Sequence, residues 1–221
     1  MRSRKKSFIL FLAVLLPGVF LWMLLRPFPG HEPKMKYGMT FSKIYSEKLN
    51  GDWKTTYAAL LDELGVRRMR LSAYWSEIEK EEGVYDFSDL DWQVNEATKR
   101  NAEVILAVGQ KLPRWPECHI PEWASTYSKS ERQERLLGHI EAVIRRYQHN
   151  PSITMWQVEN EPFLPFGECP ALDEAFLLRE VALVHSLDRT RSILLTDSGE
   201  IGRWTKAARI GDEFGTTMYF Q

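Results

Sequence analysis

Cysteine is scarce in this sequence, because its 221 residues contain only Cys118 and Cys169. Two thiols cannot build a disulfide-rich scaffold or a four-cysteine zinc site. The chain also lacks a G-x-G-x-x-G phosphate-binding motif. His119 directly follows Cys118, without the spaced partners that metal ligation needs. We therefore expect no metal site and no cofactor.

Acidic residues are absent from the first 26 positions, which hold five basic residues. The rest of the chain carries 24 basic and 30 acidic residues, a net charge of −6. A body with this excess of negative charge repels phosphate backbones. Nucleic acid is therefore excluded as the main partner.

Charge is also missing from Ser7–Leu25, a run of 19 residues. As a helix this run would be about 28 Å long, close to the roughly 30 Å hydrocarbon core of a bilayer. Basic residues precede it, so the positive-inside rule places the N-terminus in the cytoplasm and the rest outside. The alternatives are a cleaved signal peptide, with secretion of the rest, and a buried core helix.

These features predict four segments: a basic cytoplasmic tail, a transmembrane anchor, a linker rich in proline and glycine, and an extracytoplasmic body. Their bounds are residues 1–6, 7–25, 26–34 and 35–221.

The body alternates apolar, β-branched runs with amphipathic helical stretches. The expected strands are Lys36–Phe41, Val66–Leu71, Glu103–Val108, Ile153–Val158, Ser192–Thr196 and Phe214–Tyr219. The expected helices lie around residues 53–64, 90–97, 133–147, 177–184 and 203–209. For the third helix, Ser130 and Gln133 fit a capping box.

Alternating strands and helices predict a parallel sheet, either doubly wound or a (β/α)₈ barrel. The doubly wound fold predicts a glycine motif after an early strand, and none is present. The barrel is therefore favoured. We expect about six of its βα units, preceded by the transmembrane helix. Catalytic side chains of such barrels lie at the carboxyl ends of the strands.

Two of these strand ends carry distinctive residues. The fourth expected strand continues into Trp156-Gln157-Val158-Glu159-Asn160-Glu161-Pro162, and along an ideal strand Asn160 would face away from both glutamates. The second ends in Arg70, five positions before Trp75.

These stretches resemble the retaining (β/α)₈-barrel glycoside hydrolases. The closest likenesses are family 5, which includes cellulases, and family 42, the β-galactosidases. The stretch IEKEEGVYDFSDL, residues 78–90, is similar to a pattern shared by several such families.

The resemblance implies retaining hydrolysis of β-linked glycosides, with a carbohydrate as substrate. Glu161 would be the general acid/base, Asn160 would hold the sugar 2-hydroxyl, and Arg70 would brace a carboxylate. The alternatives are a turn residue for Asn160, a helix cap or ion pair for Glu161 and a surface position for Arg70. The second carboxylate is expected on a seventh strand, beyond the six strands recognised here.

Further candidates are aromatic or lie in the loops. Trp75 and Trp115 are expected to contact sugar, with Trp123 and Trp204 as further platforms, unless they pack in the core. Tyr219 is expected to hydrogen-bond the nucleophile. His119, Asp197 and Glu200 are weaker candidates for the cleft.

Cys118 and Cys169 follow neighbouring strands of the expected barrel by the same distance. They would therefore lie in adjacent loops and form a disulfide outside the cytoplasm, the alternative being two free thiols.

The best interpretation is a membrane-anchored glycoside hydrolase represented by an incomplete barrel. The alternatives are a non-catalytic carbohydrate-binding or degenerate barrel, and a gene fragment without a stable fold.

Overall fold

A computed structural model describes residues 22, 35–171, 173–199, 202 and 204–217. The chain divides into two units, Met1–Lys36 and Tyr37–Gln221. The second unit contains all the strands described below.

Six parallel strands form a single sheet in the order β1-β2-β3-β4-β5-β6. They are β1 Met39–Thr40, β2 Arg68–Ser72, β3 Glu103–Val108, β4 Ile153–Val158, β5 Ser192–Asp197 and β6 Glu213–Thr216. The order follows the sequence without the reversal that defines a doubly wound sheet. The partial (β/α)₈ barrel predicted from the sequence is thus confirmed, including the bounds of β3 and β4.

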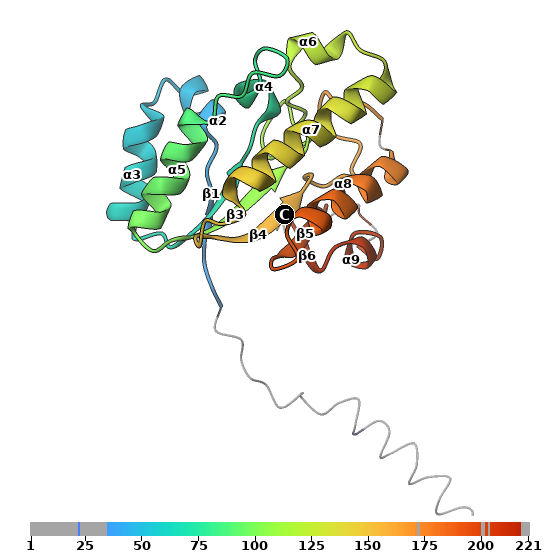
Figure 1. Ribbon diagram of the computed structural model, residues 1–221. Coiled ribbons are helices and arrows are strands. Elements are labelled where there is room, and N and C mark those ends of the chain that lie inside the picture. Colours follow the sequence, from blue (N-terminus) through green and yellow to red (C-terminus); the bar gives the residue numbers. More distant parts are fainter. Residues whose placement is uncertain (1–21, 23–34, 172, 200–201, 203, 218–221) are drawn as a thin grey trace, which may run out of the picture. The chain divides into compact units, whose positions relative to one another are not determined.

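The longer helices lie between consecutive strands and cover one face of the sheet (Figure 1). They are α3 Trp53–Asp62, α5 Ser88–Lys99, α7 Lys129–Tyr147 and α8 Glu174–Leu187. All four were expected. The shorter helices are α2 Lys43–Lys48, α4 Trp75–Ile78, α6 Glu122–Ser125 and α9 Ala207–Ile210, of which only α9 was expected.

The start of α7 differs from the prediction. Its N-cap is Ser128, whose hydroxyl accepts from the Glu131 backbone while the Glu131 carboxylate accepts from the Ser128 backbone. The predicted box of Ser130 and Gln133 was therefore wrong by two residues. Gln133 instead donates to Asp173, at the N-cap of α8.

The core lies between the sheet and the helices. Alternate strand residues are fully buried there, including Leu71, Leu106, Trp156 and Leu195. The intervening positions carry polar groups near the strand ends: Arg70 Nε donates to Thr40 Oγ1 at 2.9 Å. This alternation separates an apolar helix-facing layer from a polar layer inside the barrel.

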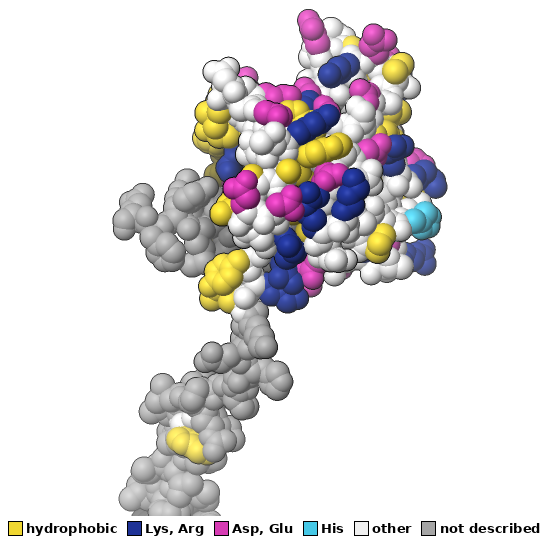
Figure 2. Space-filling view, turned by 90° about the vertical axis from the view of Figure 1, so that its left-hand side faces the viewer, with side chains coloured by type: hydrophobic (Ala, Val, Ile, Leu, Met, Phe, Trp, Pro, Cys, Tyr) yellow, Lys and Arg dark blue, Asp and Glu magenta, His cyan; other side chains and the backbone are white. Residues whose placement is uncertain are grey.

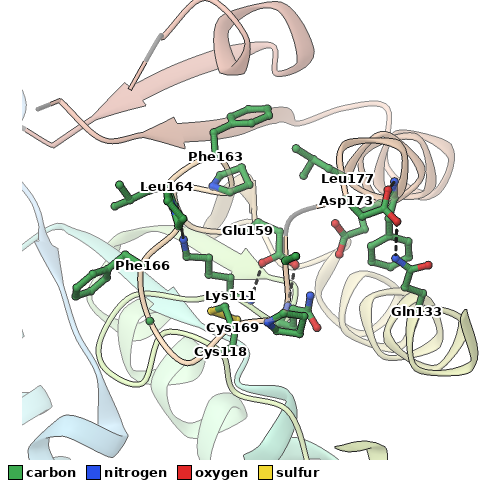
Figure 3. A pocket seen from close by; sticks show the side chains of 18 of the residues that line it. Lys111, Cys118, Gln133, Glu159, Phe163, Leu164, Phe166, Cys169, Asp173 and Leu177 are labelled. Atoms are coloured by element: carbon green, nitrogen blue, oxygen red, sulfur yellow. Dashed lines mark hydrogen bonds between the residues drawn. A yellow bond between two sulfur atoms is a disulfide. The ribbon is translucent and has the colours of Figure 1, made fainter. Parts of the chain in front are cut away.

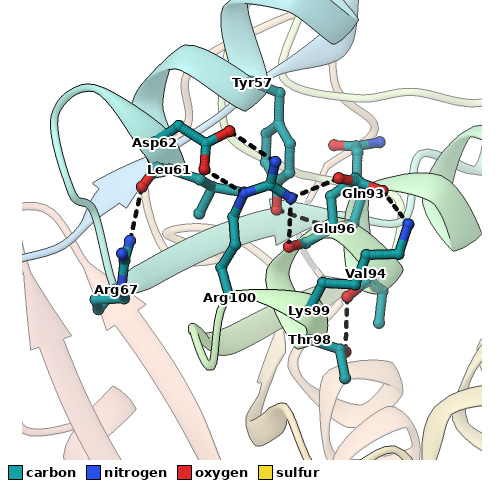
Figure 4. Close-up of polar contacts among 10 residues, drawn as sticks. All are labelled: Tyr57, Leu61, Asp62, Arg67, Gln93, Val94, Glu96, Thr98, Lys99 and Arg100. Carbon is teal, nitrogen blue, oxygen red and sulfur yellow. Dashed lines mark hydrogen bonds and ion pairs between the residues drawn. The ribbon is translucent and has the colours of Figure 1, made fainter.

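Helices α3 and α5 are joined by Arg100. Its guanidinium pairs with Asp62 of α3 and Glu96 of α5 (Figure 4). On the face shown in Figure 2, acidic and basic side chains are mixed, without a large field of one sign. Such surface pairs are worth at most about 1 kcal/mol each, so the fold depends mainly on its apolar layer.

The predicted transmembrane segment, residues 7–25, lies outside the described residues except for Trp22. Within the described part of the chain, no helix is long and apolar enough to cross a membrane. The anchor and the extracytoplasmic location therefore stay predictions.

Candidate active site

The segment after β4 does not continue as an extended strand. Glu159 has a φ of 56° and Glu161 a φ of 46°, both in the left-handed region. These turns break the alternation expected for an ideal strand, so the side chains of Glu159, Asn160 and Glu161 have three separate environments. Non-glycine residues in this region are uncommon and concentrate at functional sites.

Glu161 is held by the two strands that follow β4. Its Oε1 accepts a hydrogen bond from Thr217 Oγ1 at 3.0 Å, just beyond β6. Its backbone N–H donates to Thr196 Oγ1 of β5 at 2.9 Å. The carboxylate is half-buried, so it remains accessible to a ligand at the barrel mouth.

Lys111 fixes the loop from the other side. Its ammonium donates to the carbonyl oxygens of Glu161 and Leu164, at 2.9 and 2.5 Å. Its backbone carbonyl accepts from the N–H of Asn160 at 2.7 Å. The left-handed turn at Glu161 is therefore tied to the loop after β3.

Asn160 points to a second carboxylate. Its Nδ2 donates to Glu117 Oε2 at 3.2 Å, and its Oδ1 lies 3.4 Å from Gln157 Nε2. Glu117 is buried and has a φ of 71°. Burial raises the pKa of Glu117, and the neighbouring charge of Glu161 raises it further, while Asn160 and Lys111 oppose the shift.

Gly167, in the loop after β4, packs against Glu117 at a position that only glycine can occupy. A Cβ on Gly167, whose φ is +92°, would lie 2.5 Å from the Glu117 Cβ. The loops after β3 and β4 are also joined by the disulfide between Cys118 and Cys169, with Cα atoms 5.2 Å apart. The pairing expected from the sequence is thus present in the structure, and it secures the residue next to Glu117.

Arg70 lies inside the barrel, and among the described residues its side chain pairs with no carboxylate, so its predicted bracing of a carboxylate stays a prediction. Its Nη1 donates to Gln157 Oε1 at 3.3 Å, and within the described chain its side chain hydrogen-bonds Gln157 and Thr40. Burial lowers the pKa of Arg70, with Arg114 adding to the effect and Glu161 opposing it. Arg70 thus contributes positive charge near Glu161 and orients the amide of Gln157.

The two tryptophans predicted to contact sugar differ in exposure. Trp115 is 51% exposed on the loop after β3 and packs edge-to-face on Phe166 from the loop after β4. Trp75 is fully buried, donates to Glu79 Oε2 and packs on Trp123. The prediction for Trp75 is therefore wrong in this structure, because no face of its ring is open to a sugar.

The remaining candidates differ in burial, and two of them lie outside the described chain. Trp204 is 47% exposed, whereas Trp123 donates to the Glu79 backbone and is partly buried. His119 is buried against Tyr74, and this burial lowers its pKa to about 4. Asp197 is buried at the end of β5. Tyr219 and Glu200 lie outside the described residues.

Sequence reasoning missed Glu117, Lys111 and Thr217. Glu117 stands next to the predicted disulfide, which is the one signal that could have identified it. Lys111 and Thr217 lie 50 and 56 residues from Glu161 in the chain, so only the fold reveals their contacts.

A sequential parallel sheet, helices on one face and a glutamate following asparagine at the end of β4 are features of the (β/α)₈-barrel glycoside hydrolase clan. Residues 35–176 match the family model described as Glycosyl hydrolase family 10. The chain belongs to this family. The clan predicted from the sequence is confirmed. The sequence indicated families 5 and 42 as the closest likenesses, and the family model that matches is that of family 10.

Known relatives agree with the clan. Beta-galactosidase BgaA from Clostridium cellulovorans is 26% identical over 170 residues, 67% of this chain. The chain spans only 26% of that relative's length.

Two solved structures show the same fold. Xylanase 10B from Thermotoga petrophila RKU-1, in complex with xylobiose, matches with a TM-score of 0.61 at 16% sequence identity. The match covers 86% of this chain and 65% of the xylanase chain. GH5_18 from Streptomyces cattleya, in complex with GlcNAc, matches with a TM-score of 0.57 at 13% sequence identity. This match covers 74% of this chain and 44% of the GH5_18 chain.

Proposed function

We propose that this protein hydrolyses β-linked glycosides with retention of configuration, using Glu161 as the general acid/base. The observation that carries the proposal is the placement of Glu161. A half-buried carboxylate follows Asn160 at the carboxyl end of β4, and hydrogen bonds from three other segments hold it there. Strand ends are where the catalytic groups of such barrels lie.

In the proposed reaction, Glu161 protonates the departing glycosidic oxygen and later deprotonates the incoming water. Thr217 donates to Glu161 Oε1, and Oε2, which hydrogen-bonds none of the described residues, would carry the proton toward the leaving group. A nucleophilic carboxylate would attack the anomeric carbon from the opposite face, roughly 5–5.5 Å from the acid. We expect this second group on a seventh strand, because the described sheet contains six.

Asn160 and Glu117 form a polar pair suited to a sugar hydroxyl. Asn160 can donate to a hydroxyl oxygen, and the Glu117 carboxylate can accept the hydroxyl proton. Arg70 adds positive charge beside Glu161, which stabilises the carboxylate after proton transfer. The exposed ring of Trp115 provides an apolar face for the C–H groups of a sugar, as expected from the sequence.

The test is Glu161→Ala in the longest form of the protein that carries this chain. We expect activity to fall by about 10²–10⁴-fold on alkyl β-glycosides, because their leaving oxygen needs protonation. Activated aryl β-glycosides, such as dinitrophenyl glycosides, should lose far less in their glycosylation step. Steady-state and burst kinetics on both substrates give the comparison.

Glu168→Ala is the matched control, since Glu168 is an exposed glutamate in the same loop. It should leave both activities unchanged. Equal losses on the two substrates with Glu161→Ala would contradict the acid/base role. Saccharide binding without any turnover by the wild type would favour the carbohydrate-binding alternative.

A further inference from the structure

A cavity of about 290 Å³ lies beneath the loop after β4, against helices α7 and α8 (Figure 3). Its lining includes neither Glu161 nor Asn160. The cavity is therefore distinct from the candidate active site, although both lie against the loop that follows β4.

The walls of the cavity are largely apolar and partly aromatic. They include Phe163 and Leu164 from the loop after β4, and Phe176 and Leu177 from α8. Phe166, further along the loop, also lines the cavity and is 52% exposed. Sites for small organic molecules are typically apolar cavities with a few polar groups. A ligand that fits here must present an apolar surface to these side chains.

The two buried carboxyl groups of the lining are satisfied within the protein. Glu159 accepts the backbone N–H groups of Gln110 and Lys111, at 2.9 and 2.6 Å, and hydrogen-bonds Glu180 (Figure 3). Burial and the charge of Glu159 raise the pKa of Glu180 well above its usual value. Glu180 therefore holds the proton of this bond, and the pair carries one negative charge. The neighbouring Lys111 ammonium compensates that charge.

The helix α7 contributes two basic side chains to the lining, and only one of them is paired. Lys129 lies 2.7 Å from Asp173, and Gln133 donates to the same Asp173 oxygen at 3.1 Å. Arg132 is half-buried, and its side chain forms no ion pair or hydrogen bond with any described residue. Because the other charges of the lining compensate one another, Arg132 leaves the cavity with an excess of positive charge.

The other arginines of α7 all bind carboxylates. Arg135 pairs with Glu82, Arg145 with Glu141 and Arg146 with Asp91. A guanidinium stays charged at every physiological pH, and its planar donors match a carboxylate in a bidentate geometry. The unpaired Arg132 therefore provides an anchor for the carboxylate of a ligand, whereas a cationic ligand would be repelled.

The polar inventory of the cavity also limits the rest of the ligand. Among the polar side chains of the lining, only Arg132 and Gln110 lack a hydrogen-bond partner within the described chain. A ligand rich in hydroxyl groups would leave most of them without partners, which costs free energy. An aromatic carboxylate instead carries one anionic group for Arg132 and an apolar ring for the phenylalanines.

We propose that this cavity binds an aromatic monocarboxylate at a site outside the active site, with Arg132 holding the carboxylate and the ring packed between the loop after β4 and α8. The site goes beyond the proposed function and does not depend on it. A ligand of about ten heavy atoms in such a cavity is expected to have a Kd of about 1–10 mM.

The test is a ligand-observed NMR titration of the full chain at pH 7 with benzoate and cinnamate. Benzamide has the ring without the charge, acetate has the charge without the ring, and benzylamine has the opposite charge. We expect the aromatic acids to bind at least about tenfold more tightly than any of these three probes, because only they combine a ring with a carboxylate.

Arg132→Gln tests the anchor. It should weaken benzoate binding about tenfold, to the level of benzamide, and should leave benzamide binding unchanged. Arg132→Lys should restore part of the affinity. The matched control is Arg145→Gln, which removes another arginine of α7 about 20 Å along the helix and outside the lining. It should bind benzoate as the wild type does.

Ala171→Trp tests the cavity itself, because Ala171 is an exposed residue of its lining. We expect this change to weaken the binding of benzoate and benzamide alike. The matched control is Leu178→Trp, at an exposed position of α8 outside the lining, which should leave both affinities unchanged.

Four results would overturn the proposal. They are benzamide or benzylamine binding as tightly as benzoate, full benzoate affinity in Arg132→Gln, full affinity in Ala171→Trp, and binding of galacturonate in preference to benzoate. Asn160→Ala separates the two sites, because Asn160 does not line the cavity. Benzoate binding lost in Asn160→Ala but kept in Arg132→Gln would place the acid in the active site and refute the second site.

Discussion

Three consecutive residues after β4 have different roles because the backbone turns twice. Glu159 binds two backbone N–H groups, Asn160 contacts Glu117, and Glu161 faces the ends of β5 and β6. Each left-handed glutamate costs of order 1–3 kcal/mol, which the surrounding hydrogen bonds must offset. The two left-handed turns thus direct Glu159 to backbone N–H groups, where its role is structural, and Glu161 to the candidate catalytic position.

A histidine elsewhere in the core gives a prediction at the same scale. His139 is fully buried in α7, and burial lowers its pKa to about 4 from 6.5. The unfolded chain therefore binds more protons between these values, so stability is complete above pH 6.5 and falls as the pH drops toward 4. His139 alone accounts for about 3 kcal/mol of this loss.

Urea unfolding at pH 7 and pH 4.5 measures the effect. His139→Gln, which can still donate to the Ala73 carbonyl, should reduce the difference in free energy of unfolding between the two pH values. The exposed His149 is the matched control, and His149→Gln should leave the difference unchanged. An unaltered difference in His139→Gln would contradict the assignment.

At the scale of elements, two long-range links hold the mouth of the barrel. The disulfide joins the loops after β3 and β4 across 51 residues. Closing a loop of this length stabilises the folded state by about 4 kcal/mol in the chain-entropy model.

Replacing both Cys118 and Cys169 by serine should lower the free energy of unfolding by up to that amount. Denaturant titration measures the loss, and wild type treated with a reductant should match the double variant. A change below about 0.5 kcal/mol would show that native contacts already restrain the two loops.

The second link joins the segment after β4 to α8 through the hydrogen-bonded side chains of Glu159 and Glu180. Because the pKa of Glu180 is raised in the folded state, the native protein binds more protons than the unfolded chain above pH 4.5. Its stability therefore falls as the pH rises through the raised pKa.

Glu180→Gln cannot ionise, so we expect its stability to fall less between pH 5 and pH 8 than that of the wild type. Thermal melts across this range provide the measurement, with Glu174→Gln as a control at an exposed position of α8. An unchanged pH dependence in Glu180→Gln would contradict the raised pKa of Glu180.

At the scale of the whole molecule, the described sheet has two edges, β1 and β6, whereas a closed barrel has none. Phe214 and its neighbours in β6 form one edge, which carries no lysine or proline. An unpaired edge without these protecting residues favours pairing with another chain.

Residues 31–221 expressed alone should therefore form dimers or aggregates and should not hydrolyse aryl glycosides. Light scattering, thermal melting and an aryl-glycoside assay test this expectation. A monodisperse monomer that melts cooperatively would contradict the first part. Turnover that disappears with Glu161→Ala would contradict the second, and would mean that another carboxylate acts as nucleophile.

The sequence by itself determined the strand alternation, the position of Asn160 and Glu161 at a strand end, and the two cysteines in adjacent loops. These features follow from local patterns: residue periodicity, the spacing of turns and the order of the strands. The bounds of β3 and β4 were predictable because both strands are mainly apolar and are followed by glycine or charged residues, Gly109 and Glu159.

The tertiary structure alone decided the surroundings of these residues. Glu117 meets Asn160 across 43 positions, Thr217 meets Glu161 across 56, and Trp75 is enclosed in the core instead of facing a sugar. No periodicity predicts such contacts, because they depend on how the loops pack over the strand ends. The left-handed turns of Glu159 and Glu161 likewise require hydrogen bonds from distant segments, which exist only once the barrel has folded.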